Sequence, residues 1–305
     1  MSLTLELSRT WESHIAQHRD RHWFSGVDPF ETDLPQDLAE ALQKVGAGET
    51  AQHGELSATV IAGTADESAA YLPVLFALKN ATSKQADFTP LASLSEPYVR
   101  AHADDAAFYA TTRLVDHLDA AAQAIWRDFT GRFVCDDASV LDLMASHDSH
   151  LPVDRHPARL VGLGMNAEEL AHNLALTERV AHDLNQTPVL PFDSAQFDLV
   201  LCALSIEYLV RPEAVLREVK RVLKPGGHYV ISFSERWFPP KAVQPWPELH
   251  PFTRVAWVLR HLQRSGFTDL HSETLRGLPR PENDKYIAQV ASADPLYAAW
   301  GIAAL

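Results

Sequence analysis

The sequence predicts an α/β fold: a Rossmann-like, doubly wound sheet of seven strands, mostly parallel with an antiparallel last strand, plus a smaller N-terminal α+β region. From Ala138 onward, short apolar segments alternate with helical patterns, which is typical of a sheet covered by helices on both faces. Several of these segments, such as FDLVLC at 197–202, are continuously apolar, as expected of strands buried on both sides. At 305 residues, the chain is long enough for one large domain and a smaller unit.

The first third of the chain lacks this alternation, and we therefore separate residues 1–100 from residues 101–305. Its predicted elements are a helix over 4–20, a helix over 40–45, a strand over 56–62 and a helix over 66–78. A long helix is predicted over 104–129, because apolar residues recur there at three- to four-residue spacing. The role of residues 1–100 stays open between a lid, a surface for homodimerisation and a separate small domain.

The second part of the chain contains the strand candidates of the sheet. They cover residues 140–143, 159–163, 179–182, 197–202, 228–232, 268–273 and 285–291. Helices are expected between them over 167–176, 212–223 and 253–265. The clearest helix is 212–223, where Pro212 lies in the first turn and Gly226 lies just beyond the end. The short stretch between the last two strands contains prolines and no helical pattern, which predicts an antiparallel hairpin.

Ligand-binding residues are expected at the carboxyl ends of these strands. Open parallel sheets bind ligands there, near the point where the strand order reverses. The segments at and just after the strand ends are 142–150, 164–166, 183–185, 204–205 and 235–237. Trp237, Trp246 and Trp257 could line a substrate pocket or pack in the core.

Three stretches of this part resemble the motifs of a known family. They are VLDLMASHDSHLP (140–152), LPFDSAQFDLVLCALSIEYL (190–209) and REVKRVLKPGGHYVISFS (217–234). They are similar to the class I S-adenosylmethionine-dependent methyltransferases, and most of all to the methyltransferase type 11 group, which is related to the quinone-biosynthesis enzymes. The resemblance implies that residues 101–305 form the methyltransferase domain of an enzyme that uses S-adenosylmethionine on a small-molecule substrate. It also implies that residues 108–119 roof the active site.

The resemblance further implies a cofactor site built from the strand ends. Its members are Asp142, Met144, Ala145, Ser146, Ser149, Gly164, Met165, Asn166, Asp183, Leu184, Leu204 and Ser205. In the family, the acid at the Asp142 position precedes the turn that holds the methionine part of the cofactor. Met165 matches the apolar contact to adenine, and Asp183 matches the acceptor for the adenine amino group. Hydroxyl groups of Ser146 or Ser149 could bind the cofactor carboxylate.

The chain departs from the family pattern at two places. Met144, Ala145 and Ser146 stand where the family has a glycine-rich turn, and Gly164 stands where it has an acid that binds ribose. The small side chains of Ala145 and Ser146 still allow close approach, and Asn166 could replace the acid as a hydrogen-bonding group. These departures keep a second function class open, namely a non-catalytic protein of the same fold that binds a ligand or a protein partner.

Methyl transfer mainly requires alignment of the acceptor with the methyl group, and sometimes the removal of a proton. Candidates for proton removal are His147, His150 and Tyr208, with Glu207 and Glu235, and no spacing favours one of them. Several histidines and carboxylates follow His147 and could suggest a metal site. Such residues often lie together in loops by chance, so no metal is expected. A nicotinamide-dependent oxidoreductase is disfavoured, because no G-x-G-x-x-G follows the first strand of the sheet.

The composition limits the binding partners and the cellular compartment that we expect for this protein. The formal charge of -14 repels phosphate backbones and anionic lipid, so neither nucleic acid nor a membrane is expected as a partner. Only Cys135 and Cys202 occur, which disfavours a disulfide framework and favours a cytoplasmic protein. The N-terminus has no signal-peptide pattern, and no apolar run reaches the roughly 20 residues that span a bilayer.

Overall fold

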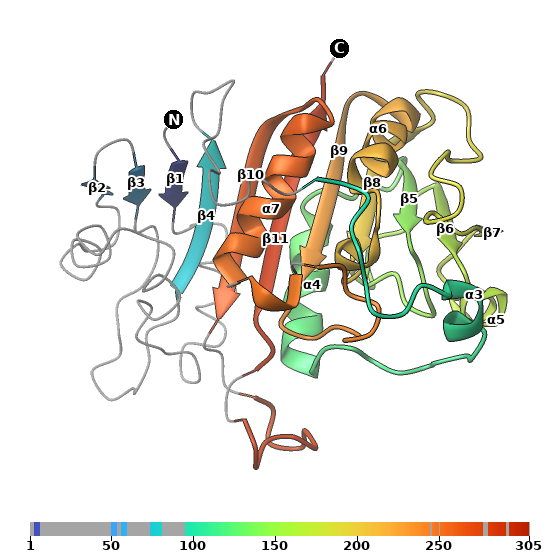
Figure 1. Cartoon of the computed structure of the whole chain (residues 1–305), viewed down its shortest axis with the longest axis horizontal. Helices are drawn as coiled ribbons and strands as arrows, with labels where there is room; N and C mark the ends of the chain where they lie inside the picture. Colours follow the sequence, from blue (N-terminus) through green and yellow to red (C-terminus); the bar gives the residue numbers. More distant parts are fainter. Residues whose placement is uncertain are drawn as a thin grey trace.

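The computed structural model describes residues 3–6, 50–53, 56–59, 74–80, 95–244, 246–249, 251–276, 280–290 and 293–304. The strands are β1 (Leu3–Glu6), β2 (Thr50–His53), β3 (Leu56–Thr59), β4 (Val74–Asn80), β5 (Ser139–Leu143), β6 (Arg159–Gly164), β7 (Glu178–Ala181), β8 (Phe197–Ala203), β9 (Leu223–Phe233), β10 (Phe267–Arg276) and β11 (Leu296–Ala303). The helices are α3 (Asp105–Tyr109), α4 (Ala120–Gly131), α5 (Ala167–His172), α6 (Pro212–Val222) and α7 (Pro251–Arg264), with 3-10 turns η5 (Ile206–Tyr208) and η6 (Trp246–Glu248). Figure 1 shows their arrangement.

All these strands belong to one sheet, in the order β2-β3-β1-β4-β10-β11-β9-β8-β5-β6-β7 (Figure 1). From β7 to β9 the neighbouring strands are parallel, whereas β11 runs antiparallel to both β9 and β10. The strands from β7 to β10 therefore confirm the predicted seven-stranded α/β sheet with an antiparallel last strand. Beyond β10, the strands β4, β1, β3 and β2 continue the same sheet.

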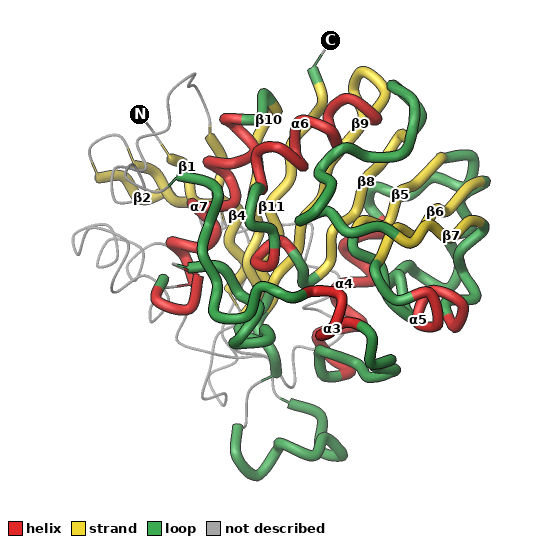
Figure 2. Tube along the Cα trace, turned by 45° about the vertical axis from the view of Figure 1, so that its right-hand side comes forward, coloured by secondary structure: helices red, strands yellow, loops and turns green. Residues whose placement is uncertain are grey.

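The chain order of the strands reverses at β5. From β5 the chain continues to β6 and β7 on one side, and later to β8 and β9 on the other. The carboxyl ends of β5 and β8 therefore border the crevice in which open α/β sheets bind ligands. At this edge α3 and α5 lie near each other (Figure 2), and Thr112 Oγ1, in the loop after α3, donates to Glu168 Oε2 at 2.6 Å.

Helices cover the sheet on both faces. On one face, α6 packs against β9 and α7 packs against β10 and β11, in an apolar cluster that contains Val219, Val258 and Ile231. On the other face, α4 packs in a second cluster that contains Trp126 and Val230. Val230 and Ile231 are consecutive in β9 and point to opposite faces, which explains why this strand is continuously apolar. Burial of each such side chain contributes about 2 kcal/mol.

Two N-terminal helix predictions are wrong where they overlap described residues. The predicted helix over 4–20 overlaps β1, and the predicted helix over 66–78 overlaps β4. β4 pairs with β1 on one side and with β10 on the other, so its backbone groups are bonded across the sheet. Pairing with distant strands overrides the local pattern. The predicted strand over 56–62 is confirmed over 56–59, and the predicted helix over 40–45 lies outside the described residues.

The long helix predicted over 104–129 is interrupted. Asp104 caps α3 and Asp119 caps α4, where Asp119 Oδ1 accepts from the N–H groups of Ala121 and Ala122. A side-chain acceptor at this position starts a new helix, because it bonds N–H groups that have no partner within the helix. Residues 110–118, between the two helices, are therefore not helical and can border the site.

The last strand of the sheet is also placed differently. Residues 285–289 form turns, and the last strand is β11, so the prediction of a strand over 285–291 is wrong. The β11 sequence LYAAWGIA is rich in small residues with weak strand propensity. Between β9 and β10 these small residues fit the space available. At Gly301, for example, a Cβ atom would lie 2.6 Å from Leu270 Cδ2. The predicted antiparallel pairing of the last two strands is confirmed for β10 and β11.

Candidate active site

A cavity of about 680 Å³ opens at the carboxyl edge of the parallel strands. Residues after β5, β6, β7, β8 and β9 border it, together with α3, the loop after α3, and the connection between β10 and β11. Of the predicted cofactor-binding residues, those lining it are Asp142, Met144, Ala145, Ser146, Gly164, Met165, Asn166, Asp183, Leu184, Leu204 and Ser205. The candidates for proton removal that line it are His147, His150, Tyr208 and Glu235. The fold thus brings residues from distant parts of the chain to one place.

Asp142 is the last residue but one of β5 and presents a buried carboxylate to the cavity. Burial raises the pKa of Asp142 to about 7, against the opposing effects of a hydrogen bond from Ser149 and of the nearby His150. Among the described residues, Asp142 Oδ2 has no hydrogen-bond partner. Ser149 does not line the cavity; its hydroxyl accepts from Asn173 Nδ2 at 2.9 Å and orients Asp142 from behind. A buried carboxylate with one oxygen left without a partner is suited to a cationic group of a ligand.

The loop after β5 has the backbone shape of a glycine turn without a glycine. Met144 has a φ of 60°, in the left-handed region that costs an ordinary residue roughly 1 kcal/mol. The Ala145 N–H donates to the Leu163 carbonyl at 2.8 Å, which holds the loop against the end of β6. At Gly164 a Cβ atom would lie 2.2 Å from the Ala145 oxygen, so no side chain fits there. The two departures from the family pattern are therefore parts of one structural feature.

The start of α5 supplies an acid for which no site role was predicted. Asn166 caps the helix by accepting from N–H groups of its first turn, and its Nδ2 donates to the Tyr109 carbonyl at 2.9 Å. Glu169 lines the cavity, where its Oε2 accepts from Ser146 Oγ at 2.7 Å and its Oε1 accepts from the Arg113 N–H at 2.8 Å. The amide of Asn166 is thus committed to the fold, whereas Glu169 places a carboxylate beside it. An acid in the first turn after a capping residue was the available signal.

The end of β7 is tied to α3 through Asn185. Asp183 Oδ1 accepts from the Asn185 N–H at 2.9 Å, and Asn185 Nδ2 donates to Asp105 Oδ2 at 2.9 Å. Asp105 also pairs with Arg100 at 2.6 Å and with the fully buried Lys241. Burial alone would raise the pKa of Asp105, but these partners lower it. The roof predicted over 108–119 contributes the lining residues Tyr109, Arg113, Val115, Asp116 and His117.

The candidates for proton removal approach the cavity from different sides. The Tyr208 hydroxyl accepts from the Phe238 N–H at 3.0 Å, and burial and the neighbouring Glu207 raise the pKa of Tyr208. Glu207 is fully buried outside the lining, and burial raises its pKa to about 8. His150 Nδ1 lies 3.3 Å from Asp148 Oδ2. Of these groups, His150 lines the cavity and can accept a proton from a ligand, whereas the raised pKa of Tyr208 keeps its hydroxyl protonated.

Part of the cavity wall comes from residues that the sequence analysis did not assign to the site. Phe238 follows β9 just beyond the predicted segment 235–237, and Lys285 and Tyr286 lie in the connection between β10 and β11. The latter two fall within the segment predicted as the last strand, and a turn segment carries no periodic signal that would reveal them. Trp237 lines the cavity, which agrees with the predicted alternative of a pocket residue rather than a core residue. Trp246 and Trp257, in contrast, are buried in the core.

Comparison with known protein families agrees with the strand order and the position of the cavity. The family described as "Methyltransferase domain" matches residues 145–231. Residues 145–231 are thus similar to a methyltransferase domain over less than a third of the chain. The match runs from the loop after β5 into β9, and it includes Met165, Asp183 and Ser205.

Curated methyltransferases match parts of this chain. The ubiquinone/menaquinone biosynthesis C-methyltransferase UbiE of Paraburkholderia xenovorans is 30% identical over 107 residues, which are 34% of this chain and 43% of that protein. The fatty-acid O-methyltransferase of Mycolicibacterium smegmatis is 34% identical over 101 residues, which are 30% of this chain and 36% of that protein. The chain thus spans less than half the length of these relatives. A solved methyltransferase from Archaeoglobus fulgidus has 15% identity and a TM-score of 0.44, covering 59% of this chain and 92% of that one.

Proposed function

We propose that this protein transfers a methyl group from S-adenosylmethionine to a small-molecule acceptor. The observation that carries the proposal is the cavity in which the ends of β5, β6, β7 and β8 meet, with the buried carboxylate of Asp142 in its wall. Its volume of about 680 Å³ falls in the range of small-molecule and cofactor sites. Its place at the reversal of strand order is where open α/β sheets bind nucleotides.

The residues present fit this cofactor. The unpaired carboxylate of Asp142 suits the cationic ammonium of its methionine part, and Asp183 suits the amino group of its adenine. The thioether of Met165 and the buried Leu184 suit the flat face of the ring. When bound, S-adenosylmethionine supplies an electrophilic methyl group on a sulfonium sulfur, and S-adenosylhomocysteine remains after the transfer.

The contribution of the chain is binding, alignment and exclusion of water. Alignment is the largest part, because an activated methyl group needs little further chemistry. Asp142 would bind the cofactor at one end of the cavity. Asp105 bonds Asn185 and Arg100, and these contacts fix the roof that α3 and the following loop form. His147 and His150 face the cavity and are the groups that we propose receive a proton from the acceptor when it carries one, because the raised pKa of Tyr208 keeps its hydroxyl protonated.

We propose the acceptor only at the level of a small molecule. The two relatives named above are a C-methyltransferase and an O-methyltransferase, so they do not agree on the acceptor atom. The formal charge of -14 argues against nucleic acid as the acceptor. Within the described ranges, no helix is long and apolar enough to cross a membrane. The free thiols of Cys135 and Cys202 support a reducing compartment, and we propose that the protein acts in the cytoplasm.

Isothermal titration calorimetry with S-adenosylmethionine and S-adenosylhomocysteine tests the proposal. We expect both to bind the wild-type protein, and we expect Asp142→Asn to weaken binding about ten-fold, because it removes one charged hydrogen bond in a buried site. Asp198→Asn is the matched control. Asp198 lies near the amino end of β8 and pairs with Lys224 at 2.8 Å, away from the cavity, so this variant should bind as the wild type does.

Two outcomes would change the proposal. Absence of binding of either compound at high micromolar concentrations would overturn the use of this cofactor. Binding without methyl transfer to any member of a broad acceptor panel would favour the non-catalytic alternative.

A further inference from the structure

The two ends of the cavity differ in charge. Asp142, Asp183 and Glu169 border it on the side of β5, β6 and β7. Arg236 and Lys285 border it from the segment after β9 and the segment before β11. In the sheet, β8 separates β9 and β11 from β5, β6 and β7. These two cations therefore belong to the opposite end of the cavity. The cavity is therefore acidic at one end, whereas the other end carries these two cations together with the carboxylate of Glu235.

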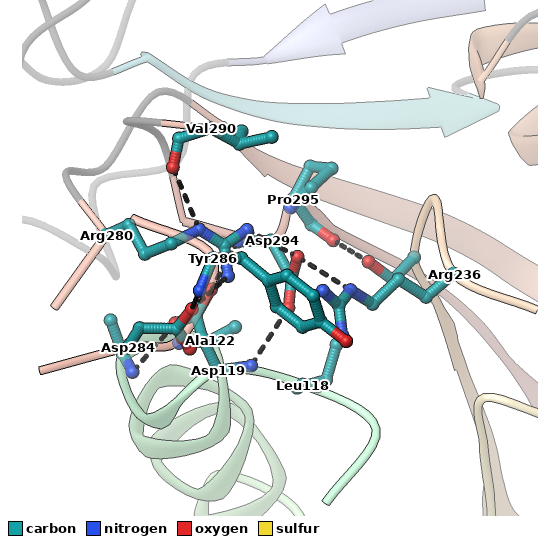
Figure 3. Close-up of polar contacts among 12 residues, drawn as sticks. Leu118, Asp119, Ala122, Arg236, Arg280, Asp284, Tyr286, Val290, Asp294 and Pro295 are labelled. Atoms are coloured by element: carbon teal, nitrogen blue, oxygen red, sulfur yellow. Dashed lines mark hydrogen bonds and ion pairs between the residues drawn. The ribbon is translucent and has the colours of Figure 1, made fainter. Parts of the chain in front are cut away.

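The cationic end is organised around one aromatic ring. Arg236 Cζ lies 4.8 Å from the centre of the Tyr286 ring, and Lys285 Nζ lies 4.9 Å from it. Figure 3 shows the Arg236 guanidinium beside this ring. Arg236 Nε also pairs with Asp294 at 3.0 Å, whereas Lys285 forms no ion pair within the described parts of the chain. The ammonium of Lys285 is thus available to a ligand.

Buried ion pairs hold this wall in place. Arg280 is 5% exposed and bonds Asp294 at 2.8 Å, Asp284 at 3.3 Å and the Val290 carbonyl at 3.1 Å (Figure 3). Asp294 also accepts from the Asp119 N–H at 2.9 Å, which joins the connection to the start of α4. The segment that carries Lys285 and Tyr286 is therefore fastened at both ends.

Aromatic rings form the adjoining surface. Phe238 lines the cavity and makes edge-to-face contacts with Phe108 at 5.3 Å and with His117 at 5.4 Å. Arg113 Cζ lies 4.5 Å from the Phe108 ring, and its Nη1 donates to the carbonyls of Phe108 and Thr111. This surface offers flat contacts and a further positive charge.

We propose that the end of the cavity formed by Arg236, Lys285, Tyr286 and Phe238 binds the methyl acceptor, and that the acceptor is a planar aromatic anion. This inference rests on the proposed function, because it assigns the acidic end to the cofactor. Glu235, the acid on the acceptor side, accepts a hydrogen bond from the Tyr297 hydroxyl at 2.9 Å. Negative charge on the acceptor would then lie near Lys285 and Arg236, and its ring would stack against the aromatic surface.

Two probes of the same shape and different charge test the inference. The protein is saturated with S-adenosylhomocysteine, and 1-naphthoate and 1-naphthamide are each titrated by calorimetry. We expect 1-naphthoate to bind roughly ten-fold more tightly than the amide. Lys285→Gln should weaken 1-naphthoate about five-fold and leave 1-naphthamide unchanged, because only the anion interacts with the ammonium. Lys224→Gln, which removes a lysine outside the cavity, is the matched control and should change neither affinity.

The outcomes separate this inference from the proposed function. If S-adenosylhomocysteine does not bind the wild-type protein, the proposed function fails and the inference fails with it. If it binds, but 1-naphthamide binds as well as 1-naphthoate, or neither binds, only the inference about the acceptor is overturned. Equal effects of Lys285→Gln on both probes would show a structural role for Lys285 and would also overturn it.

Discussion

The loop after β5 and the connection between β10 and β11 reach the same cavity from opposite ends, but different interactions hold them there. In the loop, backbone geometry dominates: Met144 is left-handed, and Ala145 passes over Gly164 with no room for a side chain. In the connection, charge dominates: the buried Arg280 binds Asp294. One wall of the cavity is therefore held by close packing of the backbone, and the other is held by ion pairs. Different substitutions should disturb them.

Arg280→Met should have the largest effect on stability. It leaves the buried carboxylate of Asp294 without its main cationic partner, which costs about 3 kcal/mol in the free energy of unfolding. Urea unfolding measures this loss. Arg159→Met breaks an exposed pair with Glu178, whose side chain is 49% exposed, and serves as the control, with an expected loss below about 1 kcal/mol. Equal losses in the two variants would contradict an ionic basis for this wall.

Gly164→Ala should come next. The added Cβ would meet the backbone oxygen of Ala145 at 2.2 Å, and backbone cannot move aside as a flexible side chain can. We expect a loss of about 2 kcal/mol in the free energy of unfolding, and weaker binding of S-adenosylhomocysteine because the loop is displaced. Gly226→Ala is the comparison, since nothing lies within 4 Å of its added Cβ and only its positive φ is strained. A smaller loss at Gly164 than at Gly226 would show that the loop is not closely packed.

The pH dependence of stability should reveal the buried charge of Asp142. Its pKa is raised from 3.8 to about 7 in the folded protein, so the folded state binds the proton more tightly than the unfolded state. The contribution of Asp142 is therefore favourable at low pH and is lost as the pH rises from about 4 to about 7. Asp142→Asn should be more stable than the wild type at pH 8, on the order of 2 kcal/mol, and should show no such advantage near pH 4.

Thermal unfolding over this pH range, for both proteins, measures the difference. An advantage of Asp142→Asn that does not change with pH would contradict the raised pKa. Added S-adenosylmethionine should reduce the advantage at pH 8, because its ammonium would compensate the charge of Asp142.

Met144→Gly should have the smallest effect. Glycine removes the left-handed strain at a φ of 60°, but it also gains freedom in the unfolded chain and loses the packing of a partly buried side chain. These effects oppose one another, so the free energy of unfolding should change by less than about 1 kcal/mol. Binding of S-adenosylhomocysteine should persist, because the backbone shape is kept. A loss above about 2 kcal/mol in unfolding experiments would mean that side-chain packing, rather than backbone shape, holds this loop.

The central strands were predictable because their signal is local. β5, β6, β8 and β9 are buried on both faces, and strands in such a position need apolar residues throughout. β11 and β4 were missed because they depend on their neighbours: β11 lies between β9 and β10, and β4 lies between β10 and β1. Small or ambiguous residues become strands there because the adjacent strands supply hydrogen-bond partners.

The candidate site divides in the same way. Asp142, Met165 and Asp183 were predictable as cavity residues because a parallel sheet places the carboxyl ends of its strands at one edge. Glu169 was missed although its place in the first turn after the capping residue Asn166 was a local signal, and Lys285 was missed because contacts between distant segments bring it there. Glu169 is held by Arg113, and Lys285 is carried by the segment that Arg280 fastens.

The sequence by itself determined the α/β class, the central parallel strands and the edge of the sheet at which the cavity lies, because polarity and its period along the chain are local properties. Only the tertiary structure decided that Gly164 makes room for the loop after β5, and that the connection before β11 is a cavity wall rather than a strand. Both features depend on contacts between separate segments. At Gly164, the backbone oxygen of Ala145 lies 2.2 Å from where a Cβ atom would be. In the connection before β11, ion pairs of Asp294 with Arg280 and Arg236 hold the segment in place.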